Sequence, residues 1–228
     1  MKTKPVLYTE WSYVLGLVLM AFAASFTAKA DFGMSMVVAP AYILHLKVSQ
    51  WLPWFSFGVA EYVFQGALVL ATVLIMRRFK WSYLFSFITA FLYGTLLDGT
   101  MALIALLPEH TFLWRAVWYL VGTVLCSLAV SLFFHTYLSP EAYVLIVKEL
   151  SAKHGWNINR VKTAYDCFST VLGVVMSFVF FGFGVFEGVK WGTVLCALIN
   201  GFLIGQFTKW LEHTFIFQNK WNIERYFI

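Results

Sequence analysis

Three acidic residues lie inside long apolar segments of this sequence. Glu61 and Asp98 are the only charged residues in their segments, and Asp166 lies near one end of another. A charged side chain inside a bilayer costs at least roughly 2.5–3.5 kcal/mol, so a functional role is the default interpretation. We expect these carboxyl groups to bind a cation or carry protons, because burial and a like neighbour favour the protonated form. The alternative is that each lies at headgroup level or caps a neighbouring helix.

One lysine suggests a second arrangement. Lys209 lies near the inner end of the last apolar segment, on the same side of the membrane as Asp166. We predict that the two side chains pair as an inner gate. The alternative is that Lys209 extends its charged end to the membrane interface.

Uncharged polar residues lie toward the middle of the same segments, and two short helices are each expected to begin at a serine. Helix N-termini that point inward favour an anionic group. The alternatives are interhelical hydrogen bonding for the mid-segment residues and simple helix capping for the second serine. The candidate substrate-binding residues are Ser35, Gln65, Thr89, Tyr93, Ser139, Asn200 and Gln206.

Signals for catalysis and metal binding are missing from the sequence. It has no His-Glu-x-x-His run, no Gly-x-Ser-x-Gly run and no nucleotide-binding loop. Cys126, Cys167 and Cys196 lie in apolar segments without the spacing of metal ligands, and we interpret them as small buried side chains. We therefore expect no enzyme, no metal and no cofactor, and uphill transport would need a gradient or a partner.

The composition indicates a chain whose solvent is lipid. Of 228 residues, 61% are hydrophobic and 12% are charged, about half the charged share of a soluble domain. The apolar runs predict an all-α integral membrane protein, and two shorter stretches, 34–46 and 142–150, predict re-entrant or interfacial helices. The six predicted transmembrane helices cover residues 11–28, 54–76, 81–107, 112–134, 161–183 and 191–215.

The chain contains two similar halves. Lys80-Trp81 returns as Lys190-Trp191, 110 residues later, and the glycine at Gly94 returns at Gly205. Each half contains a span, a short helix and two further spans. Because three is an odd number, the second half must enter the membrane in the opposite orientation. We predict a single membrane domain over residues 1–228, built from inverted repeats at about 11–110 and about 111–215.

The charged residues of the loops support the same orientation. Three basic clusters, at 77–80, 148–162 and 209–225, fall on the side of Lys2 and Lys4, and fewer basic residues fall on the other side. The positive-inside rule then places both termini in the cytoplasm of a cell membrane. The net charge of +5 is explained by this topology, so we expect no nucleic-acid partner.

Several short runs resemble the YczE/YitT-like family of bacterial multi-pass membrane proteins. They are Ala30-Asp31-Phe32-Gly33-Met34-Ser35 after the first span, Ser139-Pro140-Glu141 in the second half, and Val161-Lys162-Thr163 followed by an acid at Asp166. The resemblance covers nearly the whole chain and implies a membrane protein of transporter type without naming a substrate.

The sequence departs from this family pattern after Ser35 and after Glu141. Met36-Val37-Val38 stands where the family often has Pro-Trp-Asp, and Ala142 stands where it often has an acid. A ligand role of those acids does not carry over to this chain.

Two functions from different classes fit these observations. The first is a secondary transporter or facilitator of a small solute, with alternating access about a site at the membrane midplane. The second is a non-transporting membrane module, such as a substrate-capture subunit or an assembly factor, which would co-purify with another subunit. The expected partners are the lipid bilayer and a small-molecule solute, and assembly into a homo-oligomer stays open.

Overall fold

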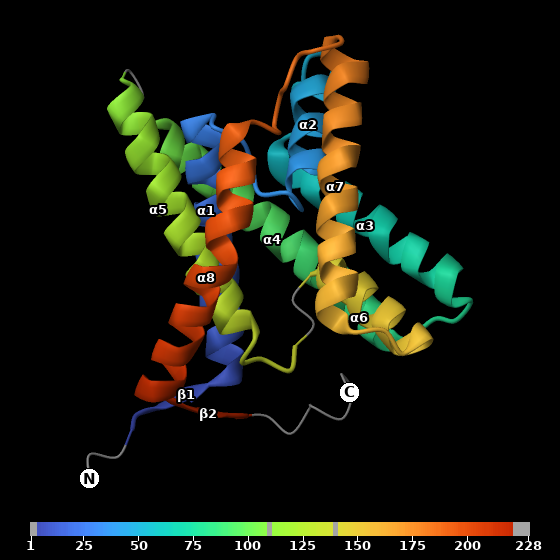
Figure 1. The fold of residues 1–228 in the computed structure, drawn as a ribbon, viewed down its shortest axis with the longest axis vertical. Helices are drawn as coiled ribbons and strands as arrows, with labels where there is room; N and C mark the ends of the chain where they lie inside the picture. The colour runs from blue at the N-terminus through green and yellow to red at the C-terminus, as the bar shows by residue number, and fades with distance from the viewer. Residues whose placement is uncertain (1–3, 109–110, 139–140, 221–228) are drawn as a thin grey trace.

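A computed structural model describes residues 4–108, 111–138 and 141–220 of the chain, and most of these residues are helical. Six of the helices are long and apolar enough to cross a membrane (Figure 1). They are α1 (Thr9–Ala30), α3 (Phe57–Met76), α4 (Trp81–Ala105), α5 (Phe112–Phe133), α7 (Ile158–Phe181) and α8 (Trp191–Thr214). The prediction of an all-α membrane protein with six spans is therefore confirmed, and the ends differ from the predicted ones by no more than three residues.

Two further helices are too short to span a bilayer, namely α2 (Ala39–Val48) and α6 (Ala142–His154). The first begins five residues later than the apolar pattern predicted. Gly33 has a positive φ of 110°, and Pro40 stands in the first turn of α2, where its missing N–H costs nothing. The backbone N–H of Val38 instead closes a turn on the Ser35 carbonyl at 3.1 Å.

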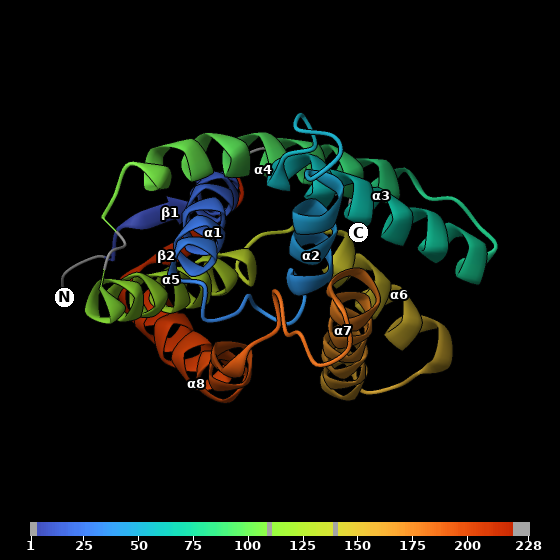
Figure 2. The same ribbon diagram turned by 90° about the horizontal axis from the view of Figure 1, so that it is seen from above.

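The helices form two groups that lie side by side (Figure 2). One group consists of α1, α5 and α8, and the other consists of α2, α3, α6 and α7, while α4 contacts α1, α3 and α6. Small residues bring α1 and α5 close together: a Cβ added at Gly122 would lie 3.0 Å from the Ala23 carbonyl oxygen. Such close backbone approach is typical of helix packing in membranes.

The two ends of the described chain meet at one end of the bundle. Strand β1 (Val6–Tyr8) pairs in parallel with β2 (Ile216–Gln218), with Val6 opposite Ile216. We call this the terminal end, and the other the opposite end. Since α1 leaves the terminal end and each later span reverses direction, the α3–α4 connection also lies at the terminal end, as does the start of α7 (Figure 1).

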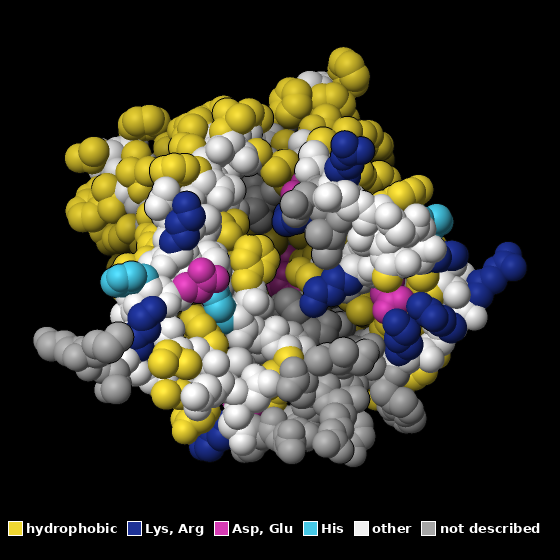
Figure 3. Space-filling model, turned by 60° about the horizontal axis from the view of Figure 1, so that its bottom comes forward, with side chains coloured by type: hydrophobic (Ala, Val, Ile, Leu, Met, Phe, Trp, Pro, Cys, Tyr) yellow, Lys and Arg dark blue, Asp and Glu magenta, His cyan; other side chains and the backbone are white. Residues whose placement is uncertain are grey.

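The packing of the last two spans of each half differs. Helix α4 packs along α3, where Gly94 and Gly58 approach so closely that a Cβ on Gly94 would lie 2.6 Å from the Gly58 carbonyl oxygen. Over the described residues, α7 and α8 do not pack along each other, and they belong to different groups (Figures 1 and 2). Seen from the terminal end, the surface is hollowed between the two groups, and acidic side chains are visible within the hollow (Figure 3).

Candidate functional site

A buried polar cluster lies where the start of α6 meets α3. The Glu61 carboxylate, on the second turn of α3, accepts hydrogen bonds from the Tyr143 hydroxyl at 2.7 Å and from the Gln65 amide at 3.2 Å. The Gln65 carbonyl oxygen accepts a hydrogen bond from the backbone N–H of Ala142 at 3.3 Å. Glu61 and Gln65 are completely buried. The first turn of α6 is thus fastened to the interior of a membrane-spanning helix.

A second carboxyl group belongs to the same cluster. Glu141 precedes α6, is buried, and interacts electrostatically with Glu61. Burial, and then the neighbouring Glu61 carboxylate, raise the pKa of Glu141 to about 8. Among the residues that the structure describes, neither glutamate forms an ion pair. Two acids that are buried together without a basic partner among the described residues favour a state in which at least one of them holds a proton.

Two polar atoms of the cluster have no hydrogen-bond partner in the described part of the chain. They are Oε1 of Glu61 and the hydroxyl oxygen of Tyr93. Tyr93 is a buried residue of α4 and interacts electrostatically with both Glu61 and Glu141. Buried polar atoms normally have partners. We define the carboxyl cluster as Glu61, Gln65, Tyr93, Glu141 and Tyr143.

The carboxyl cluster unites three residues that the sequence singled out, namely Glu61, Gln65 and Tyr93. Sequence reasoning did not assign Glu141 or Tyr143 to a site. Glu141 falls in a segment between two spans, where charged residues usually face water. Its position near the start of a short apolar helix in such a segment was the one signal available.

Three other candidates join neighbouring helices by hydrogen bonds. The Asp98 carboxylate accepts a hydrogen bond from the Ser56 hydroxyl at 2.5 Å and one from the backbone N–H of Gly58 at 2.8 Å, which fastens α4 to the start of α3. Thr89 lies 2.5 Å from the Tyr13 hydroxyl of α1. Matched to Thr89 in the second half, Asn200 accepts a hydrogen bond from the Ser127 hydroxyl of α5 at 2.6 Å. Thr89 and Asn200 thus each bond to the first span of their own half of the chain.

The remaining candidates lie elsewhere. Ser35 lies between α1 and α2 and lines a small cavity, Gln206 is exposed on α8, and Ser139 lies outside the described residues. Asp166 pairs with Lys162 one turn away at 2.7 Å, and its second carboxylate oxygen is buried without a hydrogen-bond partner among the described residues. Lys209 is exposed on α8, which is separated from α7, so the predicted Asp166–Lys209 pair is not formed in this conformation.

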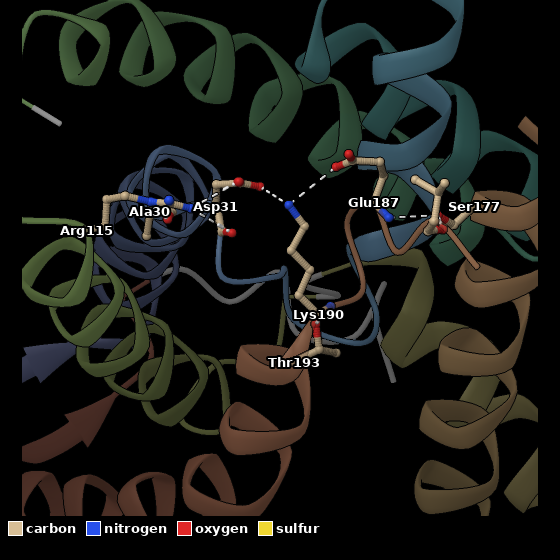
Figure 4. Close-up of polar contacts among 8 residues, drawn as sticks. Ala30, Asp31, Arg115, Ser177, Glu187, Lys190 and Thr193 are labelled. Carbon is tan, nitrogen blue, oxygen red and sulfur yellow. Dashed lines mark hydrogen bonds and ion pairs between the residues drawn. The ribbon is translucent and has the colours of Figure 1, made fainter. Parts of the chain in front are cut away.

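Ion pairs join several segments at the opposite end (Figure 4). The Asp31 carboxylate, just after α1, pairs with Arg115 of α5 at 3.0 Å and with Lys190, before α8, at 2.6 Å. Lys190 also lies 3.4 Å from Glu187. The backbone N–H of Glu187 donates to the Ser177 hydroxyl of α7 at 2.7 Å. This Asp31 network, defined by Asp31, Arg115, Ser177, Glu187 and Lys190, joins both helix groups at the end away from the hollow.

The described residues contain no group of three or more His, Cys, Asp and Glu side chains placed to hold a metal ion. The arrangement can instead hold and move protons, or receive a small cation between two carboxyl groups. The ordered hydrogen bonds of Gln65 and Tyr143 orient one of those carboxyl groups.

Comparison with known proteins identifies relatives along most of the chain. The profile of a protein family of unknown function, DUF6198, matches residues 7–209. The uncharacterized membrane protein YczE of Bacillus subtilis (strain 168) is 22% identical over 203 residues, which cover 88% of this chain and 86% of YczE. No solved structure gives a significant match. The matched region includes the carboxyl cluster and the Asp31 network.

Proposed function

Since this chain belongs to the DUF6198 family of YczE-like membrane proteins, as its sequence predicted, we propose that it is a secondary transporter or facilitator of a small solute. The observation that carries the proposal is the carboxyl cluster, in which two glutamates are buried together without a basic partner among the described residues. Ionisable groups are retained inside membrane proteins mainly along ion and proton pathways. The carboxyl cluster is the proton-coupling site of the proposed transport cycle.

The pattern of helix contacts supports inverted repeats. Helix α1 contacts α4, and its counterpart α5 contacts α8. Helix α2 contacts α3 and α7, and its counterpart α6 contacts α7 and α3. Among the described residues, each of these contacts has an equivalent in the other half, whereas the α3–α4 and α4–α6 pairs have none of comparable extent. In transporters built from inverted repeats one repeat or bundle rocks against the other, and contacts that only one half forms are the ones that such a motion would exchange.

Contacts of the short helices support a re-entrant course. Helix α6 begins beside Gln65 in the interior of α3. Near its end, Lys153 donates a hydrogen bond to the Ile75 carbonyl, in the last turn of α3, at 2.8 Å. Helix α2 likewise begins near Gly173 of α7 and ends where Lys47 donates to the Phe180 carbonyl at 2.8 Å. Each short helix starts within the membrane and returns to the side from which its segment entered.

The unequal packing of the two halves supports alternating access. The Asp31 network closes the opposite end, while α7 and α8 are separated around the hollow at the terminal end (Figures 3 and 4). In the other conformation α8 packs along α7 as α4 packs along α3. Lys209, the counterpart of Asp98, then approaches the buried second carboxylate oxygen of Asp166 and forms the inner gate.

The basic residues at the terminal end favour an orientation with both termini in the cytoplasm. Arg77, Arg78 and Lys153 lie toward the terminal end, and Arg115 and Lys190 take part in the network at the opposite end. In a chain without native cysteines, Gly155→Cys should react with an impermeant thiol reagent only in inside-out vesicles. The reverse labelling pattern would contradict this orientation.

Proton-driven solute uptake tests the proposed function. The purified protein is reconstituted in vesicles with a pH-sensitive dye inside, and small solutes are added in pools under a pH gradient. We expect at least one pool to move protons through the wild type, and Glu61→Gln and Glu141→Gln to abolish this movement. The matched control is Glu212→Gln, which removes a carboxyl group with a 61% exposed side chain. Solute-dependent proton movement that is equal in the Glu61 variant and the wild type would refute the assignment.

A further inference from the structure

A small cavity lies in the α1, α5 and α8 group, away from the carboxyl cluster. Its volume is about 20 Å³, which holds about one water molecule or one metal ion. Four of the residues that line it carry sulfur: two methionines, from α1 and from the segment before α2, and two cysteines, from α5 and α8. They are Met20, Met34, Cys126 and Cys196.

Two of the sulfur atoms have the spacing of ligands that share one ion. The Cys126 thiol lies 3.9 Å from the thioether sulfur of Met20. Two sulfur atoms bound to one metal ion at roughly 2.3 Å each, with an angle near 120°, lie roughly 4 Å apart. Met20 and Cys126 can therefore bind one ion at their present sulfur–sulfur distance. The thioether of Met34 lies on the same cavity, 3.7 Å from the Thr27 hydroxyl.

Four hydroxyl groups line the cavity, and three of them have acceptors within the protein; the fourth belongs to Ser35. Thr27 donates to the carbonyls of its own helix, Thr123 donates to the Tyr119 carbonyl at 2.9 Å, and Tyr119 donates to the Gly192 carbonyl. A water molecule in the cavity would thus find one hydroxyl donor, that of Ser35. The other side chains of the lining that can bind an ion are the two thiols and the two thioethers.

We propose that Met20, Met34, Cys126 and Cys196 form a binding site for one soft monovalent metal ion of the Cu(I) class. Thiol and thioether ligands select Cu(I) over harder ions, and the four ligands include no carboxylate or imidazole. Binding releases a proton from a cysteine thiol, so a thiolate balances the charge of the ion inside the membrane. This site is independent of the proposed transport of a solute.

The site was hidden in the sequence because its ligands are far apart along the chain. Cys126 and Cys196 show no metal-ligand spacing, and the two methionines belong to different segments. Only the packing of α1 against α5 and α8 brings them around one cavity. The third cysteine, Cys167, is exposed on α7 and does not line it.

Anaerobic titration with Cu(I) tests the site. The full-length protein in detergent competes for Cu(I) with a coloured chelator, and X-ray absorption identifies the atoms bound to the metal. We expect one Cu(I) per chain with sulfur neighbours alone, and an affinity that rises at least about tenfold for each pH unit because a proton is released. The control is Cys167→Ser, which should bind as the wild type does.

Two double variants remove ligands in different ways. Cys126→Ser with Cys196→Ser removes the thiols, and Met20→Leu with Met34→Leu removes the thioethers while nearly conserving side-chain volume. Each double variant should fail to form the one-to-one complex with Cu(I). A cooperative unfolding transition, with a midpoint near that of the wild type, would show that the variant is folded. Retained binding in the folded methionine variant, loss of binding in Cys167→Ser, nitrogen or oxygen neighbours, or no uptake by the wild type would each overturn the proposal.

Discussion

Gly94→Ala is the sharpest test of how α3 and α4 are held together. The added Cβ would lie 2.6 Å from the Gly58 carbonyl oxygen and 3.1 Å from the ring of Tyr62. An ordinary contact needs roughly 3.5 Å, so the two helices must separate by roughly 1 Å. Because the obstacle is backbone rather than the end of a flexible side chain, rotation of a side chain cannot relieve it.

The expected cost follows from two effects. Overpacking of this kind typically costs about 1–3 kcal/mol. Separation also lengthens the hydrogen bonds of Asp98 to Ser56 and Gly58, which are 2.5 and 2.8 Å long, and a weakened bond adds about 1 kcal/mol. Alanine regains at most about 1 kcal/mol of helix propensity. We expect Gly94→Ala to lower the free energy of unfolding by about 1–3 kcal/mol.

The matched control is Gly205→Ala, its counterpart on α8. A Cβ added at Gly205 has no atom within 4 Å among its described surroundings, so this variant should be neutral or slightly stabilising. The assay is reversible unfolding of both variants in mixed micelles, followed by circular dichroism. Equal stability of Gly94→Ala and Gly205→Ala would refute the reasoning, because the two substitutions are chemically identical and differ only in their surroundings.

Three further predictions concern ionisable groups. The pKa of Glu141 is raised from 4.5 to about 8, so as the pH rises the unfolded chain loses this proton before the folded chain does. The free energy of unfolding should therefore fall between these two pH values, and in Glu141→Gln the unfolding midpoint should vary less with pH over that range. Burial alone would raise the pKa of Glu149, but hydrogen bonds and charges from Lys80, Tyr83 and Arg78 lower it overall. The ionised Glu149 should therefore stabilise the fold above pH 4.5, and this stabilisation should be lost as the pH falls through the lowered pKa. Glu149→Gln should lose less stability than the wild type on acidification. Asp166→Cys combined with Lys209→Cys, in a chain without other cysteines, should form a disulfide under oxidation if α8 approaches α7, and a chain that stays uncrosslinked would contradict the proposed gate.

The spans could be predicted from the sequence because lipid imposes one requirement on every residue that faces it. A run of about 20 apolar residues has no other stable environment, and the predicted ends therefore lie close to the observed ones. The short helices obey a weaker rule. Pro40 fixed the start of α2 more strongly than the apolar pattern did.

The carboxyl cluster could be predicted only in part. Glu61 and Gln65 stood out as polar residues within an apolar run, whereas Glu141 stands beside an apolar run and is buried by the packing of α6 on α3. Local pattern contains no information on that packing. The same limit applies to Gly94 and Gly205, which are equivalent in sequence and differ in the structure because one has a partner helix and the other faces open space.

The paired strands at the terminal end determine which parts of the chain can move as one. Strand β1 leads into α1 and β2 follows α8, so the pairing joins the first and last spans, which both contact α5. This connected set takes α1 from the first half of the chain and α5 and α8 from the second. The chain crosses between the helix groups at 31–38, between α5 and α6, along α4 and at 182–190. The 182–190 connection contains three glycines with positive φ. In the proposed transport cycle, hinge bending would be concentrated at these crossings, and the boundary of motion would cut across the two halves of the sequence rather than run between them.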